Sequence, residues 1–201
     1  KNKNLENFTI EDYHKYVSDE EHAKIIINTG RLYPKDLNLD DKQFVIFVQD
    51  IIKSRLGYLP KGRDYSQWII LRLNRPNSIG FNPVHKDIYG DYDQLSDPRR
   101  MINVWIPLCG VNNFSGLPIV PKSHLFKESE ICRTKAGAIV NGQKYGVNCI
   151  KSWQGRNNMK LISPEPGNLL LFSSHLIHGF GRNNNKNKTR ISLEFRLHAK
   201  D

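Results

Sequence analysis

Residues 166–178 read Pro-Gly-Asn-Leu-Leu-Leu-Phe-Ser-Ser-His-Leu-Ile-His. The first three residues are typical of a turn, and the apolar run after them predicts a buried strand. His175 and His178 follow that run. Because they are three residues apart, they would point to opposite faces of an extended strand. We expect one of them to bind a metal and the other to be structural or to lie near the substrate.

Similar short segments fill the chain after Gly57. They are rich in β-branched or aromatic residues and are separated by Gly, Pro and Asn, which predicts strands. The expected strands are residues 67–73, 102–108, 117–120, 168–172 and 190–197.

Before Gly57 the pattern is helical. Capping boxes are expected at Thr9 and Ser18, Gly30 is a suitable end for the second helix, and a third helix is expected over residues 40–56. Helices followed by many short strands indicate a mainly β fold with N-terminal helices, a β-sandwich or jelly roll.

The 201 residues have the size of one domain. We expect residues 1–57 to form a helical buttress and residues 58–201 to form a β core with two long loops, 88–100 and 125–161. Tyrosines and cations in these loops are suited to hold a carboxylate or phosphate, or to be solvated. The Asn-rich stretch 182–188 is expected to be a solvated hairpin loop.

Thirty Lys and Arg against twenty Asp and Glu give a net charge of +10. The basic residues are scattered, so a solvated basic surface is favoured over a nucleic-acid footprint. No window is apolar enough to predict a transmembrane span. The cysteines, Cys109, Cys132 and Cys149, lack metal-binding spacing, and we expect reduced thiols in a cytoplasmic protein.

The tripeptide His85-Lys86-Asp87 offers two metal ligands. In an extended segment residues i and i+2 share a face, so His85 and Asp87 could bind one metal, although such a tripeptide also suits a surface loop. With His175 or His178 as a third ligand, two imidazoles and a carboxylate leave open positions on Fe(II), as O2 chemistry requires.

Arg190 and Ser192 suggest a second binding function. If 2-oxoglutarate chelates such an iron, its far carboxylate needs a cation with fork geometry, which arginine supplies better than lysine. Arg190 and Ser192 would share the polar face of a strand whose other face, Ile191, Leu193, Phe195 and Leu197, packs under the helices. An arginine at a sheet edge, held in an ion pair, is the alternative.

Four motifs in this order resemble the phytanoyl-CoA dioxygenase family over roughly residues 67–197. They are His-x-Asp at 85–87, Asn-Val-Trp-Ile-Pro-Leu at 103–108, Gly-Leu-Pro-Ile-Val-Pro-Lys-Ser-His at 116–124, and the series from Pro166 through His178-Gly179 and Asn183 to Arg190-x-Ser192. The resemblance implies a double-stranded β-helix core, that is, a cupin-like jelly roll, with Fe(II), 2-oxoglutarate and O2.

Carried over by position, the resemblance implies roles for individual residues. His85 and Asp87 would be the proximal iron ligands, and His178 would be the distal one. Arg190 and Ser192 would hold the carboxylate of 2-oxoglutarate. His124 would be structural, and Lys122 stands where the family has Gly.

The function expected is a dioxygenase that hydroxylates a small molecule, with an anionic substrate as one option, and releases succinate and CO2. Asp87 favours oxygen insertion over halogenation, because halogenating relatives lack this carboxylate. Desaturation, cyclisation and epimerisation stay open, as does the oligomeric state. The alternatives are a nucleic-acid-modifying oxygenase and a non-catalytic cupin-like module that binds a metal or a sugar; neither nucleic acid nor membrane is the expected partner.

Overall fold

The structure is a computed structural model. It describes residues 6–40, 43, 46, 50, 69–78, 82–91, 101–140, 142–154, 158–179 and 181–198. The helix predicted over 40–56 lies almost wholly outside the described residues, and so does most of the predicted loop 88–100.

The N-terminal helices are short. A 3-10 turn, η1 (Ile10–Asp12), leads into α1 (Tyr13–Tyr16), and α2 (Asp19–Thr29) and the 3-10 helix η2 (Pro34–Leu37) follow.

The predicted capping box at Ser18 forms. The Ser18 hydroxyl accepts from the Glu21 N–H at 3.3 Å, the Glu21 carboxylate accepts from the Ser18 N–H at 2.8 Å, and Gly30 caps the far end of α2. The box predicted at Thr9 does not form; the Thr9 hydroxyl bonds to the Asp12 carboxylate instead.

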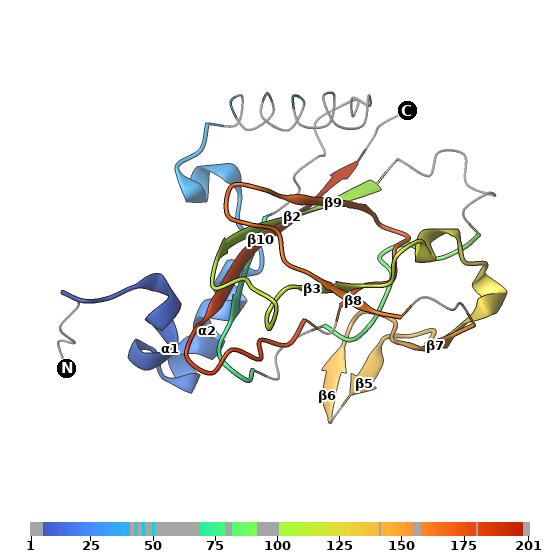
Figure 1. The fold of residues 1–201 in the computed structure, drawn as a ribbon, viewed down its shortest axis with the longest axis horizontal. Helices are drawn as coiled ribbons and strands as arrows, with labels where there is room; N and C mark the ends of the chain where they lie inside the picture. Colours follow the sequence, from blue (N-terminus) through green and yellow to red (C-terminus); the bar gives the residue numbers. More distant parts are fainter. Residues whose placement is uncertain are drawn as a thin grey trace.

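Four antiparallel strands form the larger sheet, in the order β1 (Ile70–Asn74), β10 (Arg190–His198), β2 (Met101–Cys109) and β9 (Leu170–Ser173) (Figure 1). Each corresponds to a predicted strand. The two long strands β10 and β2 lie side by side at the centre. Since β10 also pairs with β1, the sheet joins the end of the predicted β core to its start.

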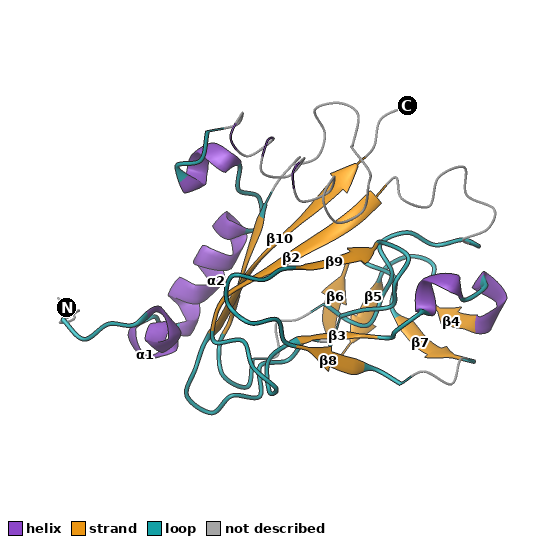
Figure 2. Ribbon diagram, turned by 45° about the horizontal axis from the view of Figure 1, so that its top comes forward, coloured by secondary structure: helices purple, strands orange, loops and turns teal. Residues whose placement is uncertain are grey.

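A second layer runs below this sheet (Figure 2). Strands β3 (Leu117–Ile119) and β8 (Lys160–Ile162) pair, and isolated bridges join Ile119 to His178 and His178 to His85. From one edge to the other, the second layer therefore consists of the His85 segment, the His178 segment, β3 and β8. Two layers with this antiparallel pairing form the predicted jelly roll.

The larger sheet packs its apolar face against the N-terminal helices. Ile191 lies in a buried cluster with Leu73 and Tyr13 of α1, and Phe195 lies in another with Ile69. Alternation along β10 therefore turns Arg190, Ser192 and Glu194 toward the other layer, as predicted for the first two.

Two predicted loops differ in part from the expectation. Residues 125–161 contain the 3-10 helix η6 (Glu128–Glu130) and the antiparallel pairs β4 (Ile131–Arg133) with β7 (Ile150–Trp153) and β5 (Ala138–Val140) with β6 (Gln143–Tyr145). Strands of three or four residues show little periodicity by themselves; β3 and β9 are as short, but both lie in apolar runs that the sequence marks.

The Asn-rich stretch is not a solvated loop throughout. Asn183 is fully buried and Asn185 is 8% exposed. The Asn183 amide donates to the carbonyls of Asn74 at 2.8 Å and Lys188 at 2.7 Å. Composition alone did not reveal this, because asparagine amides can satisfy a turn's backbone as well as bind water.

Lys122, where the resemblance implied a glycine, has a left-handed backbone. Its φ is 65°, in the left-handed region, and it precedes the 3-10 helix η5 (Ser123–Leu125). A lysine can adopt this conformation at a steric cost of about 1–2 kcal/mol.

The three cysteines are free thiols, as predicted. None of the helices in the described part of the chain has the length and apolar character that a bilayer-spanning helix needs.

Candidate metal centre and anion pocket

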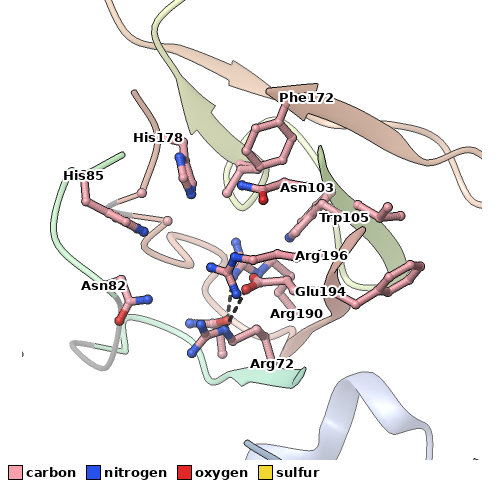
Figure 3. A pocket seen from close by; sticks show the side chains of 16 residues that line it. Arg72, Asn82, His85, Asn103, Trp105, Phe172, His178, Arg190, Glu194 and Arg196 are labelled. Carbon is pink, nitrogen blue, oxygen red and sulfur yellow. Dashed lines mark hydrogen bonds and ion pairs between the residues drawn. The ribbon is translucent and has the colours of Figure 1, made fainter. Parts of the chain in front are cut away.

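His85 and His178 are cross-strand neighbours. The N–H of each donates to the carbonyl of the other, at 2.8 and 2.9 Å. Residues paired in this way in an antiparallel ladder point to the same face. Their ring centroids are 4.3 Å apart, and both rings face the space between the two layers (Figure 3).

Asp87 completes a group of three. Its Oδ1 lies 4.0 Å from His85 Nε2, and its Oδ2 lies 3.5 Å from His178 Nε2. One potential ligand atom from each residue lies within 4.8 Å of the others, and no second group of this kind occurs among the described residues. The structure thus brings together the three ligands that the resemblance implied.

Both histidines have the tautomer that a metal requires. His85 Nδ1 lies 2.7 Å from the Pro83 carbonyl, and His178 Nδ1 lies 2.9 Å from the Leu176 carbonyl. A carbonyl only accepts, so each Nδ1 carries the proton and each Nε2 keeps its lone pair for a metal.

Asp87 is held from both sides. Asn103 Nδ2 donates to Oδ2 at 2.5 Å and is itself oriented by the Ser174 hydroxyl at 2.8 Å, while Arg196 Nη2 donates to Oδ1 at 2.5 Å. Sequence reasoning missed the contacts that Asn103 and Arg196 make with Asp87.

The protonation states also suit a metal. Burial alone would raise the pKa of Asp87, but His178, Arg196 and His85, with the Asn103 hydrogen bond, lower it to about 2. Burial, and then the neighbouring His178, lowers the pKa of His85 to about 4. At neutral pH the carboxylate is therefore charged and the His85 imidazole is neutral, as metal binding requires.

His175 lies outside this group. It is 2% exposed, and burial, followed by the nearby Lys86 and His124, lowers its pKa. Neither His175 nor His124 lines the pocket. The expectation that one histidine of the 175–178 pair is structural is consistent with this placement.

A pocket lies between the two layers, beside the candidate metal centre. Its polar lining includes Asn74, Asn82 and Asn103 with Arg72, Arg190, Arg196 and Glu194, and its apolar lining consists of Val104, Trp105, Leu117, Phe172 and Phe195. Figure 3 shows the two histidines together and the arginines gathered around Glu194.

Arg190 is buried in this pocket near Glu194, and its hydrogen bonds within the described residues go to neutral acceptors. Its Nη2 donates to Asn74 Oδ1 at 2.6 Å, and its Nη1 donates to the Ser115 carbonyl at 3.1 Å. Burial lowers its pKa to about 10, so it stays charged at neutral pH. A buried guanidinium held only by neutral acceptors can bind an anion.

Three buried polar atoms support that interpretation. Arg190 Nε, Trp105 Nε1 and Ser192 Oγ have no hydrogen-bond partner in the described part of the chain. The Arg190 guanidinium lies 5.8 Å from the Trp105 ring centroid, and Ser192 follows Arg190 on the same face of β10. Unsatisfied donors beside a buried cation fit the carboxylate of a ligand.

Trp105 is 1% exposed, so it is a core residue, and it also lines the pocket.

Sequence reasoning missed Arg72, Glu194 and Asn74. The alternation from Arg190 to Ser192 would have found Glu194 and Arg196, because they continue the same polar face. Of the loop cations considered for substrate, Arg133 bonds to Glu128 at 2.5 Å and stacks on Tyr89, and neither Arg133 nor Tyr89 lines the pocket.

Residues 13–192 match the sequence model of the family described as phytanoyl-CoA dioxygenase. The chain belongs to the phytanoyl-CoA dioxygenase family. Together with the His-Asp-His group, this membership indicates Fe(II) and 2-oxoglutarate as cofactors. No curated protein matches the chain.

Solved structures that match the chain include AviO1 from Streptomyces viridochromogenes Tue57 (19% identity, TM-score 0.44) and SnoK, a non-haem α-ketoglutarate-dependent carbocyclase of nogalamycin biosynthesis (16%, 0.47). The matches cover 65% of this chain in both cases, and 49% and 48% of those chains, so the chain spans about half their length. An N-substituted L-amino acid dioxygenase from Burkholderia ambifaria AMMD matches over 98% of this chain and 75% of its own, at 16% identity and a TM-score of 0.42.

Proposed function

We propose that the protein is an Fe(II)- and 2-oxoglutarate-dependent dioxygenase whose iron is held by His85, Asp87 and His178. The observation that carries the proposal is the convergence of two Nε2 atoms and a carboxylate within 4.8 Å, with both Nδ1 atoms bonded to carbonyls. Two histidines and one carboxylate leave open positions on iron. When bound, the iron and 2-oxoglutarate supply O2-dependent oxidation of a substrate, with release of succinate and CO2.

The co-substrate would be oriented by Arg190. Its guanidinium, with Ser192 Oγ and Trp105 Nε1, offers donors to the far carboxylate of 2-oxoglutarate. Asn74 and the Ser115 carbonyl hold the guanidinium in place. Positioning by such a preformed clamp leaves the iron-facing part of the pocket for substrate.

The proposed reaction is hydroxylation of a small molecule. Asp87 occupies the ligand position that a halide would take in a relative lacking this carboxylate, which favours oxygen insertion over halogenation. Asn103 holds that carboxylate in place. Desaturation and cyclisation would use the same residues, and product analysis distinguishes them.

The alternatives are less well supported. A nucleic-acid-modifying enzyme would use its cations on an open basic groove, whereas Arg72, Arg190 and Arg196 line a pocket between two sheets beside Glu194. In a module that binds only a metal or a sugar, the buried Arg190 would have no anionic ligand to bind. A cytoplasmic location is consistent with the three free thiols.

The test combines binding and turnover. Wild-type protein should bind one divalent metal and one 2-oxoglutarate in anaerobic calorimetry, and should release succinate with Fe(II), ascorbate and O2 when a substrate panel contains an acceptor. Asp87→Ala should lower metal affinity by at least about 100-fold, since loss of even an outer-shell partner costs 10–100-fold. Asp91→Ala, four residues further along the chain, is the control. Wild-type protein that binds neither metal nor 2-oxoglutarate would contradict the proposal, as would a chlorinated product.

A further inference from the structure

The site holds more cations than carboxylates. The described residues in and beside the pocket include three arginines, Arg72, Arg190 and Arg196, and two carboxylates, Glu194 and Asp87. Arg72 pairs with Glu194 at 3.0 Å, Arg196 pairs with Asp87, and Arg190 has neutral acceptors. Of these interactions, the ion pair between Arg196 and Asp87 is the one that a metal bound by Asp87 would disturb.

Arg196 and the metal would compete for the same carboxylate. The Asp87 oxygen that accepts from Arg196 is also the oxygen that lies 4.0 Å from His85 Nε2. A divalent cation bound by Asp87 and His85 must lie close to the guanidinium. Repulsion between the two cations, together with neutralisation of Asp87 by the metal, weakens the ion pair.

The released guanidinium would stay in the pocket. The Arg196 side chain is 31% exposed and lines the pocket, while Glu194 is already paired with Arg72. Close to the metal ligands the wall is apolar: the Phe172 ring lies 5.0 Å from that of His178. The Arg196 guanidinium, without its counter-ion, would then lie near an apolar wall. Such a site suits a ligand that has both an anionic group and an apolar body.

We propose that Arg196 exchanges partners when iron binds: it leaves Asp87 and takes the carboxylate of the substrate, which is a small carboxylic acid with an apolar body. The inference rests on the proposed function for the iron site and the Arg190 clamp. Charge balance supports it, because iron adds two positive charges and 2-oxoglutarate removes two. The three arginines and two carboxylates of the described residues therefore still leave one positive charge. A substrate with one carboxylate neutralises it.

The first measurement uses the metal alone. Arg196→Gln removes the competing cation, so it should bind Mn(II) roughly three- to tenfold more tightly than the wild type. Arg182→Gln, an exposed arginine in the loop before β10, should bind Mn(II) as the wild type does. Looser or unchanged Mn(II) binding in Arg196→Gln would overturn the competition between arginine and metal.

The second measurement uses phenylacetate and phenylacetamide as probes, titrated anaerobically into protein loaded with Mn(II) and 2-oxoglutarate. The acid should bind at least about tenfold more tightly than the amide, because a charge-assisted hydrogen bond is lost with the amide. Arg196→Gln should lose this preference. Arg196→Lys should keep part of it, and Arg182→Gln all of it. Without Mn(II), the wild type should lose most of the preference, because Arg196 remains on Asp87.

The outcomes separate the two proposals. Wild-type protein that binds no Mn(II) refutes the iron site and the exchange with it. Normal binding of Mn(II) and 2-oxoglutarate, with no preference for the acid or with the preference retained in a folded Arg196→Gln, leaves the dioxygenase assignment standing and overturns the role of Arg196. Thermal unfolding of each variant verifies that it is folded.

Discussion

Gly179 lies so close to His85 that a Cβ on Gly179 would stand 2.9 Å from His85 Nδ1 and 2.5 Å from the carbonyl oxygen of Pro83. That nitrogen and that carbonyl form the hydrogen bond that orients the His85 ring. Gly179 also has a φ of +108°, which L side chains rarely adopt. The residue after His178 therefore has to be glycine for the other histidine to keep its position.

Gly179→Ala should lower both stability and metal affinity. The backbone strain costs about 1–3 kcal/mol, and the collision with Pro83 and His85 displaces a metal ligand. Urea unfolding and Mn(II) calorimetry measure the two effects. Gly167→Ala is the control, because Gly167 has a φ of +87° but open space around it. The control should lose stability and keep its metal affinity; equal metal affinity in both variants would contradict the argument.

The two histidines of the 175–178 pair should separate cleanly in metal binding. His178→Ala removes one of three ligands and should abolish measurable Mn(II) binding. His175→Ala should leave the Mn(II) dissociation constant within about twofold and cost about 1–3 kcal/mol of unfolding free energy, because a buried side chain is truncated. On the same preparations, calorimetry measures the Mn(II) dissociation constant and urea unfolding measures the free energy of unfolding. Loss of metal binding in His175→Ala would show that the ligand assignment is wrong.

Arg190→Lys should weaken 2-oxoglutarate binding by at least about tenfold although the charge is kept, because a lysine lacks the planar fork. Lysine also cannot reproduce both bonds that fix the guanidinium, to Asn74 and Ser115. Mn(II) affinity without 2-oxoglutarate should stay unchanged. Arg182→Lys is the matched surface control. Wild-type affinity for 2-oxoglutarate in Arg190→Lys would remove Arg190 from the co-substrate site.

Acid should destabilise the metal-free protein through His85. Its pKa is about 4 in the folded protein and about 6.5 in the unfolded chain, so between these values the unfolded chain binds more protons. Unfolding free energy therefore falls as pH falls through that window, by roughly 2–3 kcal/mol at pH 4.5 from this residue. The loss between pH 7 and pH 4.5 should be smaller in His85→Gln, measured by urea unfolding of both metal-free proteins. Identical losses would contradict the burial of a neutral His85.

Much of the architecture could be predicted from the sequence because it depends on local patterns. Alternation along residues 190–197 placed Ile191 and Phe195 on the helix-facing side, and the turn at residues 166–168 marked the start of β9. The capping box at Ser18 satisfies helix N–H groups through residues three apart, which a sequence displays directly. The short strands β4 and β5 were not predicted, since three residues carry little periodicity unless, as at β3, they lie in an apolar run.

The sequence by itself determined the chemistry available: a His-x-Asp pair, two further histidine candidates, and an arginine with a serine on one strand face. Only the tertiary structure decided which groups meet. His178 faces His85 because the two backbones pair across the sheet, and Arg196 reaches Asp87 because β10 lies across the pocket from the His85 segment. Such contacts join residues about a hundred positions apart, and their geometry depends on how two layers pack rather than on any local pattern.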